Sequence, residues 1–110
     1  MKSNALGKDA ELRAQEFLKS SGLEIISTNY HSRFGEVDII AKSPQTLHFI
    51  EVKATLGNYD PLERITPKKI QKIVKTINYF LLKNDISQDF QIDAIIIQNN
   101  SIEWIKNISY

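Results

Sequence analysis

The sequence predicts an α/β fold in which helices flank a mixed central β-sheet. Three observations support this class: an apolar stripe at helical spacing in residues 4–20, several short β-branched segments, and one long amphipathic helix that begins at residue 67. The predicted order is helix, three strands, helix, and one or two further strands. A hairpin that is joined through a helix to another strand gives a sheet with both antiparallel and parallel pairs.

The first predicted helix covers residues 4–20, and three strands follow it. Its apolar stripe consists of Leu6, Ala10, Ala14, Phe17 and Leu18. Gly22 lies just past the helix, where a left-handed residue commonly ends one. The strands are predicted over residues 23–30, 35–41 and 46–54. The turn-forming residues 43–45 separate the last two strands, so we expect a hairpin there.

The second predicted helix follows a loop over residues 55–65 and ends around Asn84. Thr66 is suited to cap the helix, and Pro67 fits its first position. The apolar face consists of Ile70, Ile73, Val74, Ile77 and Leu81, and another face carries Lys68, Lys72 and Lys75. Further strands are predicted over residues 90–97 and 102–105.

Composition narrows the class of protein. The 110 residues are expected to form one domain, spanning 1–110. The net charge of +1 means that any basic surface must arise from local clustering. The absence of cysteine leaves oxygen or imidazole ligands for a metal. No apolar run resembles a signal peptide or a membrane span, so we expect a cytoplasmic protein that does not enter a membrane.

Two predicted strands carry acids where a core strand usually carries Val or Ile. They contain the segments GEVDII (residues 35–40) and FIEVKA (residues 49–54). Side chains alternate along a strand, so Glu36 and Asp38 should share one face, with Val37 and Ile39 on the other. Glu51 and Lys53 should likewise share a face. A hairpin centred between residues 44 and 45 then places Asp38 opposite Glu51, and Glu36 opposite Lys53.

Two carboxylates directly opposite one another repel, unless a cation lies between them. Carboxylate oxygens suit a hard divalent ion such as Mg²⁺ or Mn²⁺, which also contacts the phosphate oxygens of a substrate. A lysine beside such a site can hold an attacking water or stabilise negative charge that develops at phosphorus. The alternative interpretation is a set of solvated cross-strand ion pairs, which contribute little to stability.

These motifs resemble the core of the PD-(D/E)XK nuclease superfamily, in which an acid on one strand is followed by Glu-Xaa-Lys on the next. Val37-Asp38 replaces the usual Pro-Asp, and Glu51-Val52-Lys53 supplies the second motif. The chain is more narrowly similar to the YraN family of small bacterial proteins. That similarity also covers Gly7, Ala10-Glu11, Ala14, Gly22, Asn29-Tyr30, Gly35-Glu36, Thr66-Pro67-Lys68-Lys69 and Ile92-Asp93. Ala54-Thr55 departs from the usual Thr-Arg, which removes an arginine able to contact phosphate.

The resemblance implies a restriction-endonuclease-like α-β-β-β-α-β core, related to archaeal Holliday-junction resolvases. It also implies a divalent-metal-dependent nuclease that hydrolyses phosphodiesters, in branched or structured DNA rather than RNA. Cutting two strands often uses paired sites, so a homodimer is compatible with this activity. The alternative is a catalytically inactive module of the same fold that binds nucleic acid or a protein partner.

The implied catalytic residues are Asp38 and Glu51 as ligands of Mg²⁺ or Mn²⁺, and Lys53 as their companion. Glu11 is either an auxiliary catalytic acid on the first helix or an ordinary exposed one. Glu36 is expected to pair with Lys53 or to support the ligands. Contacts to the phosphate backbone are expected from Lys68, Lys69, Lys72, Lys75 and Arg33.

Three other residues lie outside the expected catalytic and phosphate-contacting sets. His48 should point away from Glu51 and have a structural role. Tyr59, in the loop, could stack on a base or cover the core. Asp93 matches the family pattern, but the sequence assigns it no role.

Overall fold

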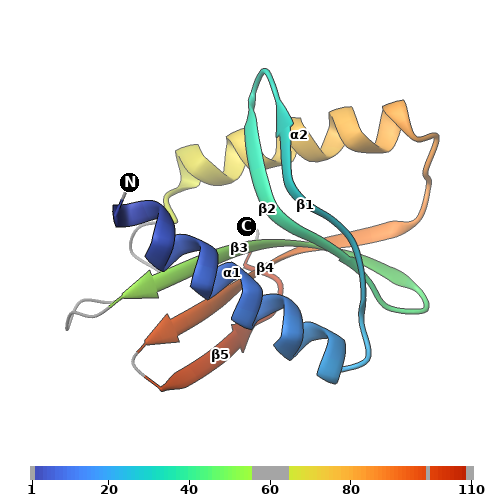
Figure 1. The fold of residues 1–110 in the computed structure, drawn as a ribbon. Helices are drawn as coiled ribbons and strands as arrows, with labels where there is room; N and C mark the ends of the chain where they lie inside the picture. The colour runs from blue at the N-terminus through green and yellow to red at the C-terminus, as the bar shows by residue number, and fades with distance from the viewer. Residues whose placement is uncertain (1, 56–64, 99, 109–110) are drawn as a thin grey trace.

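A computed structural model describes residues 2–55, 65–98 and 100–108 of the chain (Figure 1). The α/β class is confirmed, and the elements follow in the predicted order. They are α1 (Lys2–Ser20), β1 (Glu24–Ser32), β2 (Gly35–Lys42), β3 (Thr46–Thr55), α2 (Pro67–Lys83), β4 (Asp89–Gln98) and β5 (Ser101–Ile105). Tyr59 and most of its loop lie outside the described residues. No helix in the described part of the chain is long and apolar enough to cross a membrane.

The five strands form one mixed sheet in the order β1-β2-β3-β4-β5. β3 and β4 run parallel and the other neighbours run antiparallel, so α2 belongs to the crossover between the two parallel strands. In the β2–β3 hairpin, Ile39 pairs with Ile50 and Lys42 with Leu47. This is the register that the turn at residues 43–45 predicts.

One helix covers each face of the sheet, as Figure 1 shows. Ile73, Ile77 and Phe80 of α2 pack with Ile40, Phe49 and Ile92 in one apolar cluster. Ala10, Ala14 and Leu18 of α1 pack with Ile39, Ile50 and Ile95 in another. The interior strand β4 is therefore buried on both faces over residues 92–97, which explains its unbroken apolar run at residues 94–97.

Both helix ends that the sequence marks have the expected caps. The Thr66 side chain accepts a hydrogen bond from the Lys69 backbone N–H, and Pro67 occupies the first helical position. Gly22 has a φ of +93°. Its N–H donates to the Lys19 carbonyl and that of Leu23 to the Leu18 carbonyl, which is a Schellman motif. These caps fix where α1 and α2 begin or end relative to the sheet.

The predicted alternation along β2 is wrong at one point. Val37 is buried in the cluster on the α2 side, whereas Ile39 is buried in the cluster on the α1 side. The break falls at Asp38, between the pairs that join Thr28 to Ile39 and Tyr30 to Val37. Asn29, between Thr28 and Tyr30, has a left-handed backbone with a φ of +51°. The β1–β2 hairpin therefore changes direction here, and its far end crosses α2 (Figure 1).

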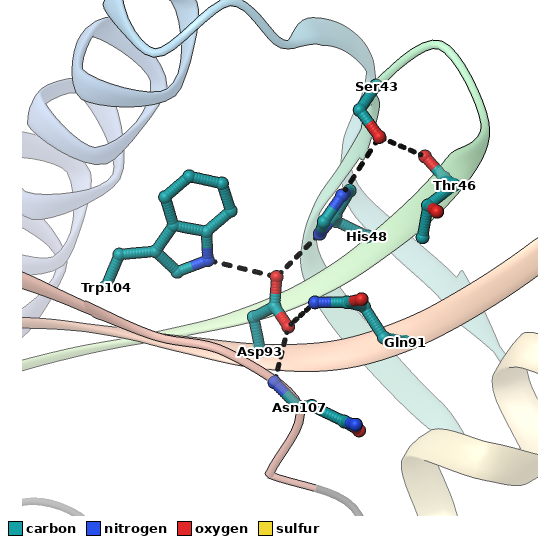
Figure 2. Close-up of polar contacts among 7 residues, drawn as sticks. All are labelled: Ser43, Thr46, His48, Gln91, Asp93, Trp104 and Asn107. Atoms are coloured by element: carbon teal, nitrogen blue, oxygen red, sulfur yellow. Dashed lines mark hydrogen bonds and ion pairs between the residues drawn. The ribbon is translucent and has the colours of Figure 1, made fainter.

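Asp93 is fully buried and accepts four hydrogen bonds (Figure 2). His48 Nδ1 lies 2.7 Å from Asp93 Oδ2, and Trp104 Nε1 donates to the same oxygen. Gln91 Nε2 and the Asn107 backbone N–H donate to Oδ1. The predicted structural role of His48 is confirmed. Because Trp104 and Asn107 belong to the last part of the chain, Asp93 anchors that part to the sheet.

Replacing Asp93 with Ala should lower the free energy of unfolding by about 3–5 kcal/mol, because the buried His48 and three part-buried donors lose their acceptor. Urea unfolding followed by circular dichroism measures this change. Asp89→Ala is the matched control, because Asp89 is an exposed acid on the same strand and its loss should cost about 0.5 kcal/mol or less. Equal losses in the two variants would contradict an anchoring role for Asp93.

Candidate active site

The candidate site lies where β2 and β3 separate. The regular pairs of this hairpin extend from Lys42 and Leu47 to Ile39 and Ile50. At the next position the Asp38 carboxylate replaces the strand pairing, because its Oδ2 accepts a hydrogen bond of 2.8 Å from the Val52 backbone N–H. The expected ladder pair of Glu36 with Lys53 is therefore not formed. The gap between the strands leaves room for other side chains.

This gap opens into a pocket of about 460 Å³. Its walls come from the first half of α1, the start of α2 and the facing parts of β2 and β3. The lining residues with polar or charged side chains are Glu11, Glu36, Asp38, Glu51, Lys53, Thr66, Lys68, Lys69 and Lys72. All four expected catalytic residues are among them. The fold thus collects acids from α1, β2 and β3 and sets them opposite lysines from α2.

Asp38 and Glu51 crowd one another in this pocket. Burial, a side-chain hydrogen bond with Glu51 and the charges of Glu51 and Glu11 raise the pKa of Asp38 from its ordinary value of 3.8 to about 8. The hydrogen bond from Val52 works in the opposite direction. At neutral pH the Asp38 carboxyl therefore holds a proton when no cation lies beside it.

Glu51 is only 5% exposed, and two lysines supply its counter-charge. Its Oε2 lies 2.8 Å from Lys69 Nζ and 3.9 Å from Lys53 Nζ. Burial and the adjacent Lys69 lower the pKa of Lys53, against the opposing effect of Glu51 and Asp38. Burial also acts to lower the pKa of Lys69, but hydrogen bonding to Glu51 raises it overall. Lys53 is consequently the lysine that gives up a proton more readily.

Glu11 leans over the pocket from α1, as the resemblance implies. Its Oε1 accepts a hydrogen bond of 3.1 Å from Asn29 Nδ2. Asn29 is the left-handed residue of β1 beside which Asp38 breaks the alternation of β2. One asparagine is therefore associated with both acids: its side chain holds Glu11, and its backbone marks the bend of the hairpin at Asp38.

Glu36 does not pair with Lys53. Its carboxylate instead lies 3.1 Å from Nδ1 of His31, the residue opposite it on β1. Both side chains are largely exposed, which makes this an exposed surface contact. Glu36 still lines the pocket, but at its rim rather than beside the ligands.

The residues expected to contact phosphate fall into two adjoining groups. Lys68, Lys69 and Lys72 line the pocket itself. Lys75 lies one turn further along α2, where its Nζ is 6.0 Å from the centre of the Phe34 ring. Arg33 contacts the same ring at 5.0 Å. The start of α2 and the β1–β2 turn thus form a basic surface that begins at the acids.

The donor set fits Mg²⁺ or Mn²⁺ bound through two carboxylates. Such ions commonly use one or two protein carboxylates and complete their coordination with waters and substrate phosphate oxygens. Asp38 and Glu51 supply those carboxylates, and their mutual repulsion favours a cation between them. Within the described residues, no group of three or more His, Cys, Asp or Glu side chains could hold a metal.

Comparison with known proteins gives the family. Residues 10–97 match the uncharacterised protein family UPF0102. The chain belongs to this family. A UPF0102 protein of Campylobacter jejuni subsp. doylei is 53% identical over 96% of this chain and 91% of its own length. Another UPF0102 protein, from Campylobacter fetus subsp. fetus, is 46% identical over 100% of this chain and 98% of its own length. This confirms the YraN-like resemblance, and the matched UPF0102 region includes every expected catalytic residue.

Three features of the site were not predicted. They are the hydrogen bond from Asn29 to Glu11, the contact of His31 with Glu36, and the contact of Lys69 with Glu51. Lys69 was expected only to contact phosphate. The sequence does indicate an acidic partner for Lys69. A lysine three residues after the cap lies at the positive end of the helix dipole, where a nearby acid stabilises it.

The stability of the metal-free protein should fall as the pH rises from about 4 to about 8. In this window folded Asp38 holds a proton that the unfolded chain has released, so raising the pH favours unfolding. Asp38→Asn removes this titration. Between about pH 4 and about pH 8, the free energy of unfolding of the variant should rise relative to that of the wild type by on the order of a few kcal/mol. Urea unfolding in EDTA at a series of pH values measures the difference, and a constant difference would contradict the raised pKa of Asp38.

Proposed function

We propose that this protein is a cytoplasmic, divalent-metal-dependent nuclease that hydrolyses phosphodiester bonds in branched or otherwise structured DNA. The observation that carries the proposal is the meeting of Asp38, Glu51 and Lys53 in one pocket. Two crowded carboxyl groups beside a lysine of lowered pKa form a set of groups suited to hydrolysis at phosphorus. The resemblance to the PD-(D/E)XK superfamily supports the same chemistry.

Each residue has a distinct task in the proposed reaction. Asp38 and Glu51 hold Mg²⁺ or Mn²⁺, which when bound supplies Lewis-acid stabilisation of the charge that develops on the phosphate. Lys53 orients the attacking water or stabilises the negative charge that develops at phosphorus. Glu11, held by Asn29, is placed to orient a further water at the side of the pocket.

The basic surface explains how DNA would reach the acids. Lys68, Lys72 and Lys75 are exposed on α2, and Arg33 is exposed in the β1–β2 turn. Lysines and arginines that contact phosphates bind DNA without reading its sequence and in a salt-dependent manner. A phosphate drawn to Lys68 or Lys72 lies in the pocket that also contains Asp38. The lysines that would bind DNA and the acids that would act on it therefore line the same pocket at the start of α2.

A second candidate function is a catalytically inactive module that binds nucleic acid or a protein partner. One observation favours it: Glu51 already has a close cationic partner in Lys69, and among the described residues no third acid or histidine completes a metal cluster. In such a module the Lys69–Glu51 pair would be permanent. The two candidates differ in cleavage and in metal uptake.

Asp38→Asn and Lys53→Ala should each reduce Mg²⁺-dependent cleavage of a synthetic four-way DNA junction by about 100-fold or more, since each removes a group that acts in the transition state. Gel electrophoresis of end-labelled junctions measures the rate. Lys42→Ala is the matched control, because Lys42 is an exposed lysine at the opposite end of the β2–β3 hairpin. Wild-type rates in all three variants, with circular dichroism showing that they are folded, would reject the assigned roles.

Replacing Lys72 and Lys75 together with Gln should weaken DNA binding and reduce the dependence of log K on log salt by about 2, one unit for each lost phosphate contact. Fluorescence anisotropy with labelled DNA at several salt concentrations measures both quantities. The double variant of Lys42 and Lys106, two exposed lysines outside the basic surface, should retain the wild-type slope. The same slope in all three proteins would remove α2 from the DNA interface.

A further inference from the structure

Glu51 is a buried carboxylate whose charge is compensated by lysine. Its Oε2 lies 2.8 Å from Lys69 Nζ and 3.9 Å from Lys53 Nζ. The Glu51 side chain is only 6% exposed, so solvent cannot provide the counter-charge that a buried carboxylate requires. Both ammonium groups therefore converge on an oxygen that a divalent ion would also need.

Lys69 stands at a position where its own helix disfavours a cation. It is the third residue after the cap Thr66, and its backbone N–H is held by the Thr66 side chain. The first turn of α2 contains no acid, and the positive end of the helix dipole repels an ammonium group. Glu51, on the neighbouring β3, supplies the compensating charge. The partner of Lys69 is thus a proposed metal ligand.

The Lys69 ammonium can leave Glu51 without disturbing α2. Its side chain is 37% exposed and ends a flexible four-carbon stem, while the cap fixes the backbone. Lys53, which starts from β3, is less exposed at 24% and is further from the same oxygen. Lys69 lines the pocket beside Lys68 and Lys72, where its released charge would meet a phosphate.

We propose that the Lys69 ammonium group neutralises Glu51 in the metal-free protein and that a divalent ion displaces it from Glu51. This inference rests on the proposed function, because it takes Asp38 and Glu51 as the metal ligands. An ammonium group 2.8 Å from Glu51 Oε2 and a divalent ion on that oxygen repel one another, so the two compete. The displaced ammonium group is then free to contact the substrate phosphate. Metal binding and nucleic-acid binding therefore favour one another.

Calorimetric titration of Mn²⁺ into the wild type, Lys69→Met and Lys72→Met tests this proposal. Lys72→Met removes the same charge from the same pocket, one turn further along α2, and controls for general electrostatics. Lys69→Met should bind Mn²⁺ about 10-fold more tightly than the wild type, and Lys72→Met about 3-fold more tightly or less. Lys69→Arg, which keeps the charge beside Glu51, should bind as weakly as the wild type.

The possible results separate this inference from the proposed function. Equal Mn²⁺ affinity in Lys69→Met and Lys72→Met would overturn the role of Lys69 but leave the metal site in place. No binding heat in any protein would overturn both proposals. Asp38→Asn should abolish the heat, which shows that the heat arises at this site. Lys69→Gln serves as a second uncharged variant if thermal unfolding shows Lys69→Met to be unstable, and it should show the same tightening.

Discussion

The crowding of two carboxyl groups at the point where β2 and β3 part is the constraint on which the rest of the site depends. Asp38 replaces a strand hydrogen bond by accepting from Val52, and this holds its carboxyl against Glu51. Burial and the neighbouring Glu51 oppose ionisation of Asp38 and raise its pKa. The lysines that line the pocket offset the close approach of the Asp38 and Glu51 carboxyl groups.

Lysines from two different elements, Lys53 on β3 and Lys69 on α2, supply positive charge beside Glu51. Lys53 starts from the same strand as Glu51, and its side chain is the less exposed of the two lysines. Lys69 comes from α2, and its contact with Glu51 depends on how that helix packs on the sheet. The less exposed Lys53 suits a group that acts on the reacting phosphate. The more exposed Lys69 suits a group that moves away when another charge enters the pocket.

Much of this arrangement could be predicted from the sequence because it depends on local rules. The turn at residues 43–45 sets the β2–β3 register, and Thr66 and Pro67 set the start of α2. The break at Asp38 could not be predicted, because it accompanies a left-handed Asn29 on the neighbouring strand. The partners of Asp93 were equally hidden, since they are dispersed along the chain from His48 to Asn107.

The two buried acids of the described residues, Glu51 and Asp93, lie at adjacent register positions of neighbouring strands, but on opposite faces of the sheet. Asp93 pairs with Ile50, one residue before Glu51. Glu51 faces the lysines of the α2 side, whereas Asp93 contacts Trp104, which packs on the α1 side. In the part of the chain that the structure describes, the two acids have no partner in common: lysines approach Glu51, whereas His48 and Trp104 contact Asp93. A substitution among the lysines of the pocket therefore leaves the hydrogen bonds of Asp93 in place.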